Sequence, residues 1–271
     1  MNEKQGHEEP AEAASTLYLE PWLPQAGPGS LTGKIALVTG ASRGIGARVA
    51  EFLAAAGADV AVNYRSKSSR AETVVETLQG LGRRALAVQA DLTVEADVQR
   101  LAETMRREWG MLHLLVLNAS GGLEKDQPPD YSLRLNRDAQ LSMVQALLPS
   151  LPRGARVIFV TSHLAHFFGK KPVYAGYEPV ARGKQAGEQA LRALQPDFEA
   201  RGIMLIVVSG DMIDGTITPK LLDRQNRGLI HSRREAAGTL PTVAEFARAI
   251  VDACAAPGLS GGNTVYVGTI D

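Results

Sequence analysis

The sequence predicts one α/β domain built on a doubly wound parallel sheet, with about seven strands and helices on both faces. Short apolar runs alternate with longer helix-type segments from about residue 33 to the end of the 271-residue chain. Runs such as 114–117 and 157–160 are apolar at every position, as expected for parallel strands covered on both faces. The first run ends in a glycine-rich turn that leads directly into a helix pattern.

Each element is predicted from its own hydrophobic pattern. Continuous apolar runs predict strands near residues 34–39, 58–63, 84–89, 112–118, 155–161, 203–209 and 263–268. Apolar positions at helical spacing predict helices near residues 44–56, 68–81, 94–109, 131–149, 179–200 and 242–256. Because strands and helices alternate, right-handed crossovers would place the strands parallel in one sheet.

The first 30 residues differ from the rest of the chain, because they are rich in Glu, Ala, Pro and Gly and lack periodicity. This composition favours disorder. The stretch 17–24, however, contains Trp22, one of two tryptophans in the chain. Two interpretations stay open: residues 1–30 are a disordered tail, or they are an arm that docks on the domain or on a neighbouring subunit. Under both interpretations, residues 31–271 form a single domain.

Composition argues against several classes of protein. Hydrophobic residues make up 45% of the chain, enough to bury a full core, and the formal net charge is zero. A neutral chain has no electrostatic reason to bind nucleic acid or an anionic membrane, so we expect neither partner. The acidic N-terminus and the short apolar runs predict no secretory signal or membrane span. The single cysteine, Cys254, cannot form an internal disulfide, which is consistent with a cytoplasmic location.

The segment 33–46 is the strongest functional signal. An apolar run at 35–38 ends in a turn with three glycines, and a helix pattern follows at once. Glycines let the backbone approach a pyrophosphate closely, and the helix start offers unpaired N–H groups and a positive dipole end. A dinucleotide is the natural ligand of such a site. The residues expected to contact it are Gly40, Ser42, Arg43, Gly44, Ile45 and Gly46.

Residues after the second predicted strand indicate which dinucleotide binds. Ligands of such sheets lie at the carboxyl ends of the strands, which places the adenosine ribose beside Asn63, Tyr64 and Arg65. An acidic residue there would bond a free 2′-hydroxyl, whereas a basic one accommodates a 2′-phosphate. No acid follows this strand, and Arg43 can converge with Arg65 on the phosphate. The predicted cofactor is therefore NADP(H) rather than NAD(H).

The ends of the third and fourth predicted strands add cofactor contacts. Asp91, followed by Leu92, can accept a hydrogen bond from the adenine amino group, cap the next helix, or do both. Small residues after the fourth strand would let the backbone lie against the cofactor, and these are Asn118, Ala119 and Ser120.

The fifth predicted strand ends at Ser162, and His163 and His166 follow closely. A serine at the carboxyl end of a strand, with two histidines nearby, can polarise a substrate carbonyl. The structural alternative is a turn with capping hydroxyls.

Together these segments resemble the short-chain dehydrogenase/reductase family from about residue 31 onward. Residues 39–46 match its Thr-Gly-x-x-x-Gly-x-Gly motif, Asp91 matches its adenine-site aspartate, and 118–121 is similar to its Asn-Asn-Ala-Gly segment. The resemblance implies a Rossmann fold and a dehydrogenase or reductase activity. It also implies roles for Asn136, Ser162 and Lys184, which fall where the family keeps its catalytic asparagine, serine and lysine, and for Lys184 in binding the nicotinamide ribose.

One catalytic position departs from that family. Its tyrosine stands four residues before the lysine, where this chain has Val180, and valine cannot give or take a proton. Tyr177 lies just before the helix, about one turn from the empty position, and is our first candidate for the proton donor. His163 and His166, whose ordinary pKa suits proton transfer at neutral pH, are also candidates. We rank His163 second and Tyr174 third.

The resemblance also implies roles for the segment after the sixth strand. Backbone groups after Gly210, including Met212, would bind the nicotinamide carboxamide, and residues 211–238 would form a lid over the substrate. This lid is polar and basic, which is typical of a solvated pair of helices or of a surface that attracts an anionic substrate. The family commonly forms dimers or tetramers through the helices predicted near 131–149 and 179–200, so a homodimer or homotetramer is expected.

Two functions of different kinds follow. The first is an NADPH-dependent reductase that transfers hydride to a small-molecule ketone, with an atypical proton donor and no metal. General acid catalysis contributes roughly 10²–10⁴ in rate, so an activated ketone could tolerate a weak donor. The alternative is an inactive NADP(H)-binding sensor or scaffold, which Val180 favours. The presence of Asn136, Ser162 and Lys184 weighs against that alternative.

Overall fold

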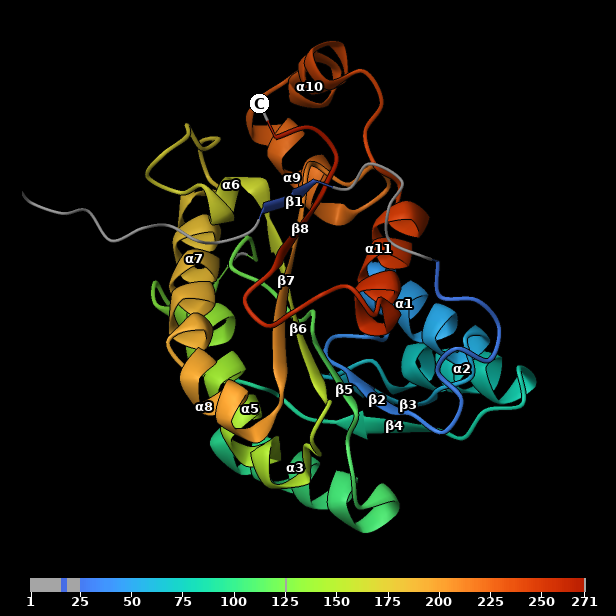
Figure 1. Cartoon of the computed structure of the whole chain (residues 1–271). Helices are drawn as coiled ribbons and strands as arrows, with labels where there is room; N and C mark the ends of the chain where they lie inside the picture. Colours follow the sequence, from blue (N-terminus) through green and yellow to red (C-terminus); the bar gives the residue numbers. More distant parts are fainter. Residues whose placement is uncertain (1–15, 19–24, 125, 271) are drawn as a thin grey trace, which may run out of the picture.

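The computed structural model describes residues 16–18, 25–124 and 126–270, and it confirms the predicted fold class. One parallel sheet forms the centre of the molecule, with strands in the order β1-β8-β7-β6-β5-β2-β3-β4 (Figure 1). The strands are β1 (Thr16–Tyr18), β2 (Ile35–Val38), β3 (Asp59–Tyr64), β4 (Ala85–Gln89), β5 (Leu114–Leu117), β6 (Arg156–Ser162), β7 (Met204–Gly210) and β8 (Thr264–Val267).

Helices cover both faces of this sheet (Figure 1). One face packs against α1 (Gly44–Ala55), α2 (Ser68–Gly80) and α11 (Val243–Ala255). The other face packs against α3 (Glu95–Trp109), α5 (Ala139–Leu147), α7 (Glu178–Arg192) and α8 (Gln195–Arg201). Successive side chains of a strand enter opposite layers, so Ala36 and Val38 belong to the first core and Leu37 to the second. Continuous apolar runs are therefore required, as the sequence indicated.

Two helices that the sequence predicts as continuous are divided. The segment 131–149 contains α4 (Tyr131–Leu133), a π-helical turn η1 (Arg134–Asp138), α5 and a final 3₁₀ turn η2 (Leu148–Ser150). The segment 179–200 breaks between α7 and α8, and Pro196 lies in the first turn of α8. Proline lacks an N–H and its ring opposes a preceding helical turn, so a helix restarts there rather than continuing.

Three short helices lie outside the segments where periodicity predicts helices, and two of them form the helical pair considered for the lid. The turn α6 (His163–His166) follows β6 directly, and the predicted lid at 211–238 contains α9 (Ile217–Gln225) and α10 (Leu229–Ala237). All three lie beyond the carboxyl ends of β6 and β7 (Figure 1). In the register of that strand pair Ser162 stands opposite Gly210. The candidate catalytic serine and the start of the lid are therefore neighbours.

Part of the N-terminal extension adds a strand to the sheet. Residues Thr16–Tyr18 form β1, which pairs in parallel with β8, and Leu17 stands opposite Val265. Farther along, the Ala26 amide donates to Asp252 Oδ1 at 2.8 Å, which fastens the chain to α11. Trp22, on which the docking interpretation rested, lies outside the described residues.

Within the described ranges no helix is long and apolar enough to cross a membrane.

Candidate active site

The turn after β2 has the shape that a dinucleotide requires. Gly40 and Gly44 have φ values of 62° and 59°, a conformation that favours glycine. A Cβ at Gly46 would lie 2.6 Å from both Gly40 O and Asn118 Nδ2, so only glycine fits there. Helix α1 starts at Gly44, and no described side chain caps its first amides. The turn therefore leaves backbone N–H groups for the phosphates of a cofactor, which fits NADP(H).

Two asparagines hold this turn in place. Asn63 is buried, its Oδ1 accepts from the Gly40 amide at 3.1 Å, and its Nδ2 donates to carbonyls of the strand β4 region. Asn118 Nδ2 donates to Thr39 O at 2.9 Å, and Thr39 Oγ1 accepts from the amides of Asn118 and Ala119. The Asn63 side chain, predicted to contact the cofactor, is thus occupied by the backbone that shapes the turn.

The two predicted phosphate-binding arginines differ in their surroundings. Arg43 lines the main cavity of the site, whereas Arg65 Nη1 donates to the Tyr131 hydroxyl at 2.6 Å. Burial raises the pKa of Tyr131, and the positive charge of Arg65 partly offsets that rise. Arg65 must share or leave this hydrogen bond to reach a 2′-phosphate. The neighbouring Tyr64 packs half-buried against the core.

The aspartate predicted at the adenine position also serves the fold. Asp91 Oδ1 accepts from the Thr93 amide at 2.9 Å and from the Thr93 hydroxyl at 2.7 Å. Asp97 in turn accepts from the Asp91 amide. These bonds close the turn before α3, although Val94, not Asp91, is the residue that precedes the helix. Leu92 is a buried core residue, so any cofactor contact it makes is through its backbone.

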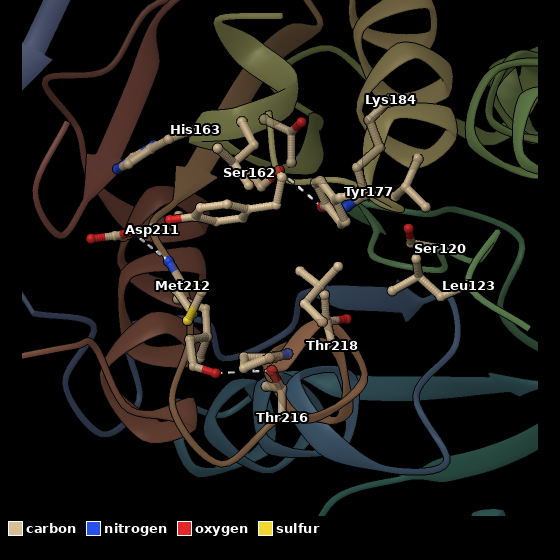
Figure 2. A pocket seen from close by; sticks show the side chains of 18 of the residues that line it. Ser120, Leu123, Ser162, His163, Tyr177, Lys184, Asp211, Met212, Thr216 and Thr218 are labelled. Atoms are coloured by element: carbon tan, nitrogen blue, oxygen red, sulfur yellow. Dashed lines mark hydrogen bonds between the residues drawn. The ribbon is translucent and has the colours of Figure 1, made fainter. Parts of the chain in front are cut away.

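A cavity of about 720 Å³ lies at the carboxyl ends of β5, β6 and β7 (Figure 2). The predicted site residues that line it are Arg43, Ile45, Asn118, Ser120, Ser162, Tyr177, Lys184, Gly210 and Met212. Outside its lining are Gly40, Ser42, Gly44, Gly46, Asn63, Tyr64, Arg65, Asp91, Leu92, Ala119 and Asn136. The cavity therefore corresponds to the nicotinamide and substrate half of the predicted site.

Ser162 and Tyr177 meet inside this cavity. Ser162 Oγ and Tyr177 Oη are 3.0 Å apart, within hydrogen-bond distance (Figure 2). Tyr177 immediately precedes α7 and is only 5% exposed. Burial raises the pKa of its phenol, and the hydrogen bond with Ser162 offsets part of that rise. Val180 is also buried and forms an apolar part of the wall.

Lys184 is held deep in the same cavity. Its Nζ donates to Val160 O at 3.2 Å, and burial lowers its pKa to about 8. It therefore still carries a positive charge at neutral pH, close to the end of β6.

Asn136 supports the site from behind the cavity. It lies in η1, where its Nδ2 donates to Gly121 O and Ser132 O, both at 2.8 Å. Its Oδ1 accepts from the hydroxyl of Ser120, which does line the cavity, at 2.7 Å. A Cβ at Gly187 would lie 2.0 Å from Asn136 O, so glycine at this position of α7 lets η1 pack closely.

The other proton-donor candidates are placed less favourably. His163 lines the cavity, but its Nδ1 pairs with Ser209 Oγ at 2.8 Å and its ring is directed away from Tyr177 (Figure 2). Burial lowers its pKa to about 4, so the ring is neutral near pH 7. Tyr174 lines the cavity near Asp211 and Arg233. His166 lies outside the cavity lining, bonded to Glu188 and Tyr266.

Sequence reasoning missed how the lid is fastened. Asp211, directly after β7, forms a two-bond ion pair with Arg233 of α10, with distances of 3.0 and 2.8 Å. Arg233 also donates to Thr269 O, and Lys171 donates to Ile270 O, so the C-terminal residues close one wall. The lid's basic character had suggested attraction to an anion, but Arg233 is neutralised within the fold. Asp211 and Arg233 are 22 residues apart in the sequence, so no local pattern in the lid indicates this pairing.

The substrate part of the cavity is mostly apolar. Its walls come from the loop after β5, from α6, α7 and α11, and from the lid. The apolar lining residues include Leu123, Leu164, Val180, Ile213, Ile217, Leu221, Leu222 and Phe246. Among the described residues no group of three or more potential ligands could hold a metal ion.

Comparison with known proteins identifies the family. The model of the short chain dehydrogenase family matches residues 34–226. The chain belongs to this family. The sequence resemblance described above is thereby confirmed.

Individual relatives include proteins named as reductases and as a dehydrogenase. Hydroxynaphthalene reductase arp2 of Aspergillus fumigatus is 38% identical over 180 residues, which cover 64% of this chain and 63% of that protein. The crystal structure of a short chain dehydrogenase from Burkholderia cenocepacia in complex with NADP matches with a TM-score of 0.77 and 31% sequence identity. The match covers 88% of this chain and 97% of the dehydrogenase. The angucycline C-6 ketoreductase LanV with bound NADP has a TM-score of 0.74 and 31% identity, with coverages of 90% and 97%.

Proposed function

We propose that this short-chain dehydrogenase is an NADPH-dependent ketoreductase whose proton donor is Tyr177. The observation that carries the proposal is the 3.0 Å contact between Ser162 and Tyr177 inside an apolar cavity that Lys184 also lines. NADP(H) is the cofactor, as in the related structures that contain it. The glycine turn would hold its pyrophosphate, and Arg43 would hold its 2′-phosphate.

When bound, NADPH would supply a hydride to the carbonyl carbon, and residues of the protein would bind and protonate the carbonyl oxygen. Ser162 binds and polarises that oxygen through its hydroxyl, and Tyr177 donates a proton to it as negative charge develops. The raised pKa of Tyr177 keeps the phenol protonated at neutral pH, which suits an acid. Lys184 would bind the nicotinamide ribose and add positive charge near the reacting atoms. Asn136 orients Ser120 and the loop after β5.

The cavity favours a bulky, largely apolar ketone. Its walls are aliphatic and aromatic, and a few polar groups gather at Ser162, Tyr177 and Tyr174. The hydroxynaphthalene reductase and the angucycline ketoreductase act, by their names, on fused aromatic compounds. An aromatic or polycyclic ketone is the substrate class that agrees with both observations.

We further propose a cytoplasmic homodimer or homotetramer. The support is the family resemblance and the single buried cysteine, Cys254.

The proposal is tested by NADPH oxidation with the purified protein against aromatic ketones, diketones and quinones, with NADH in parallel. Turnover with NADPH but not NADH is the expected result. If NADPH binds tightly and no ketone in the panel is reduced, the alternative function, an NADP(H) sensor, gains support instead.

A further inference from the structure

Four polar side chains form a cluster behind the active site that the reaction does not use. The Glu188 carboxylate lies 2.9 Å from His166 Nδ1, and Tyr266 Oη lies 2.7 Å from His166 Nε2. Arg192 Nε donates to Glu188 at 2.9 Å, and its other nitrogens donate to Gly262 O and Thr264 Oγ1. The cluster joins α6, α7 and β8.

The hydrogen-bond pattern places one proton on the histidine ring. Glu188 is buried and receives Arg192, so its carboxylate is an acceptor and His166 Nδ1 carries a proton. The Tyr266 hydroxyl, which can donate or accept, completes the hydrogen bonding of the ring at Nε2. Phe167 stacks on Tyr266 with ring centroids 5.8 Å apart, and His166 meets both rings edge-on. Every member of the cluster is satisfied, which makes it a rigid unit.

Sequence spacing places this cluster one helical turn behind the catalytic groups. His166 comes four residues after Ser162, and Ser162 itself begins α6 by accepting from the Ala165 amide at 3.3 Å. Glu188 comes four residues after Lys184 on α7, the helix that Tyr177 precedes. Helices α6 and α7, which follow Ser162 and Tyr177, lie side by side (Figure 1), and the pair of His166 and Glu188 connects them.

We propose that His166 and Glu188 are positioning residues that set the approach of Ser162 to Tyr177. Tyr177 precedes α7, whereas Lys184 lies within this helix. The geometry of α7 therefore does not by itself fix the distance between the hydroxyls of Tyr177 and Ser162. The contact between His166 of α6 and Glu188 of α7 supplies that constraint. This inference rests on the proposed reductase function.

The test compares His166→Ala with Arg192→Ala. Both substitutions remove one partner of Glu188, but only His166→Ala removes a contact between α6 and α7, because Arg192 lies in α7 itself. We expect His166→Ala to lower kcat by about 10²-fold, while the KM for the ketone and the Kd for NADPH change by less than about threefold. Arg192→Ala should lose thermal stability to a similar degree and keep kcat within about threefold of the natural protein.

A conservative pair of variants separates positioning from general support. The amide of Glu188→Gln can still hydrogen-bond His166, so kcat should stay within about threefold, whereas Glu188→Ala should lose about 10²-fold. The proposal is wrong if His166→Ala keeps kcat within about twofold of the natural protein, or if Arg192→Ala loses as much.

A second measurement does not depend on turnover. Amide hydrogen exchange should accelerate about tenfold or more in residues 163–167 and 178–182 of His166→Ala, and remain near the natural rate in Arg192→Ala. Unchanged exchange in His166→Ala would overturn the proposal even if no substrate is reduced. Absent turnover in the natural protein, with the expected exchange pattern, would count against the reductase function and leave the connection between α6 and α7 supported.

Discussion

The cofactor half of the site, around the turn after β2, and the catalytic half, between β6 and α7, are built in different ways. In the first half the backbone makes the site, and Gly40 and Gly44 adopt conformations that few other residues tolerate. In the second half side chains make the site, and the hydroxyl beside Ser162 comes from Tyr177 instead of position 180. Backbone sites are tied to fixed sequence positions, whereas a side-chain group can be supplied from any residue that reaches the same point.

The largest effect should come from removing the relocated hydroxyl. Tyr177→Phe removes the proposed acid, and we expect kcat to fall by roughly 10²–10⁴ while the Kd for NADPH stays nearly unchanged. Steady-state kinetics and a fluorescence titration of NADPH measure the two quantities. An unaltered kcat would assign the proton to another donor.

A companion variant tests whether the hydroxyl can return to the family's usual position. Val180 already lines the cavity, so in Tyr177→Phe/Val180→Tyr a phenol would again face the site. Partial recovery of kcat relative to Tyr177→Phe is expected. A variant that folds, binds NADPH and shows no recovery would mean that the two positions are not equivalent.

The next largest effect tests the backbone half. In Gly46→Ala the new Cβ would meet Gly40 O at 2.6 Å and the Ala41 Cα at 2.9 Å. We expect about 1–3 kcal/mol loss in the free energy of unfolding and about tenfold or more weaker NADPH binding, because the turn must open. Denaturant melts and NADPH titration measure both. Gly80→Ala is the matched control, since nothing lies within 4 Å of its added Cβ. Equal behaviour of the two variants would show that close approach at Gly46 is unimportant.

A smaller effect concerns the choice between NADPH and NADH. Arg43→Ala should reduce the preference for NADPH about tenfold, because it removes a charge-assisted contact to the 2′-phosphate. Arg65→Ala should reduce the preference less, since Arg65 is already bonded to Tyr131. The ratio of the two dissociation constants is the measurement. A larger loss from Arg65→Ala would show that its bond to Tyr131 breaks when the cofactor binds.

The mildest perturbation is a change of pH. The pKa of Lys184 is lowered to about 8 in the folded protein, so its charge is lost as pH rises through that value. We expect kcat/KM to fall above about pH 8, by up to tenfold per pH unit. The free energy of unfolding should instead rise between about pH 8 and 10.5, because the folded state no longer has to bury a charge that the unfolded state retains.

His163 provides the internal control for this profile. Its pKa of about 4 keeps it neutral from pH 5 to 7, so His163→Gln should leave that part of the profile unchanged. A flat rate up to pH 9 in the natural protein would contradict the role given to the charge of Lys184.

Sequence reasoning located most of the fold because apolar runs and glycine spacing are local signals. It placed Tyr177 first among the donors, and the structure brings Tyr177 to Ser162, although the catalytic role itself stays a prediction. It missed the π-helical turn at Asn136 and the short α6, since neither leaves a periodic pattern. It did not show that the Asn63 side chain bonds the glycine turn, because a strand-end position does not reveal such bonds; the contact of Asn63 with the cofactor stays a prediction.

The remaining features that sequence reasoning missed are interactions between residues far apart in the chain. The pairing of Asp211 with Arg233 and of His166 with Glu188 joins segments whose contact depends on the packing of several elements. Single-sequence patterns carry no information on such pairs.

The closing of one cavity wall by Thr269 and Ile270 has a practical consequence for protein engineering. Both residues line the cavity, and their carbonyls accept from Arg233 and Lys171. Side-chain substitutions at these two positions would therefore reshape the cavity wall while keeping the backbone hydrogen bonds that fasten it to Arg233 and Lys171.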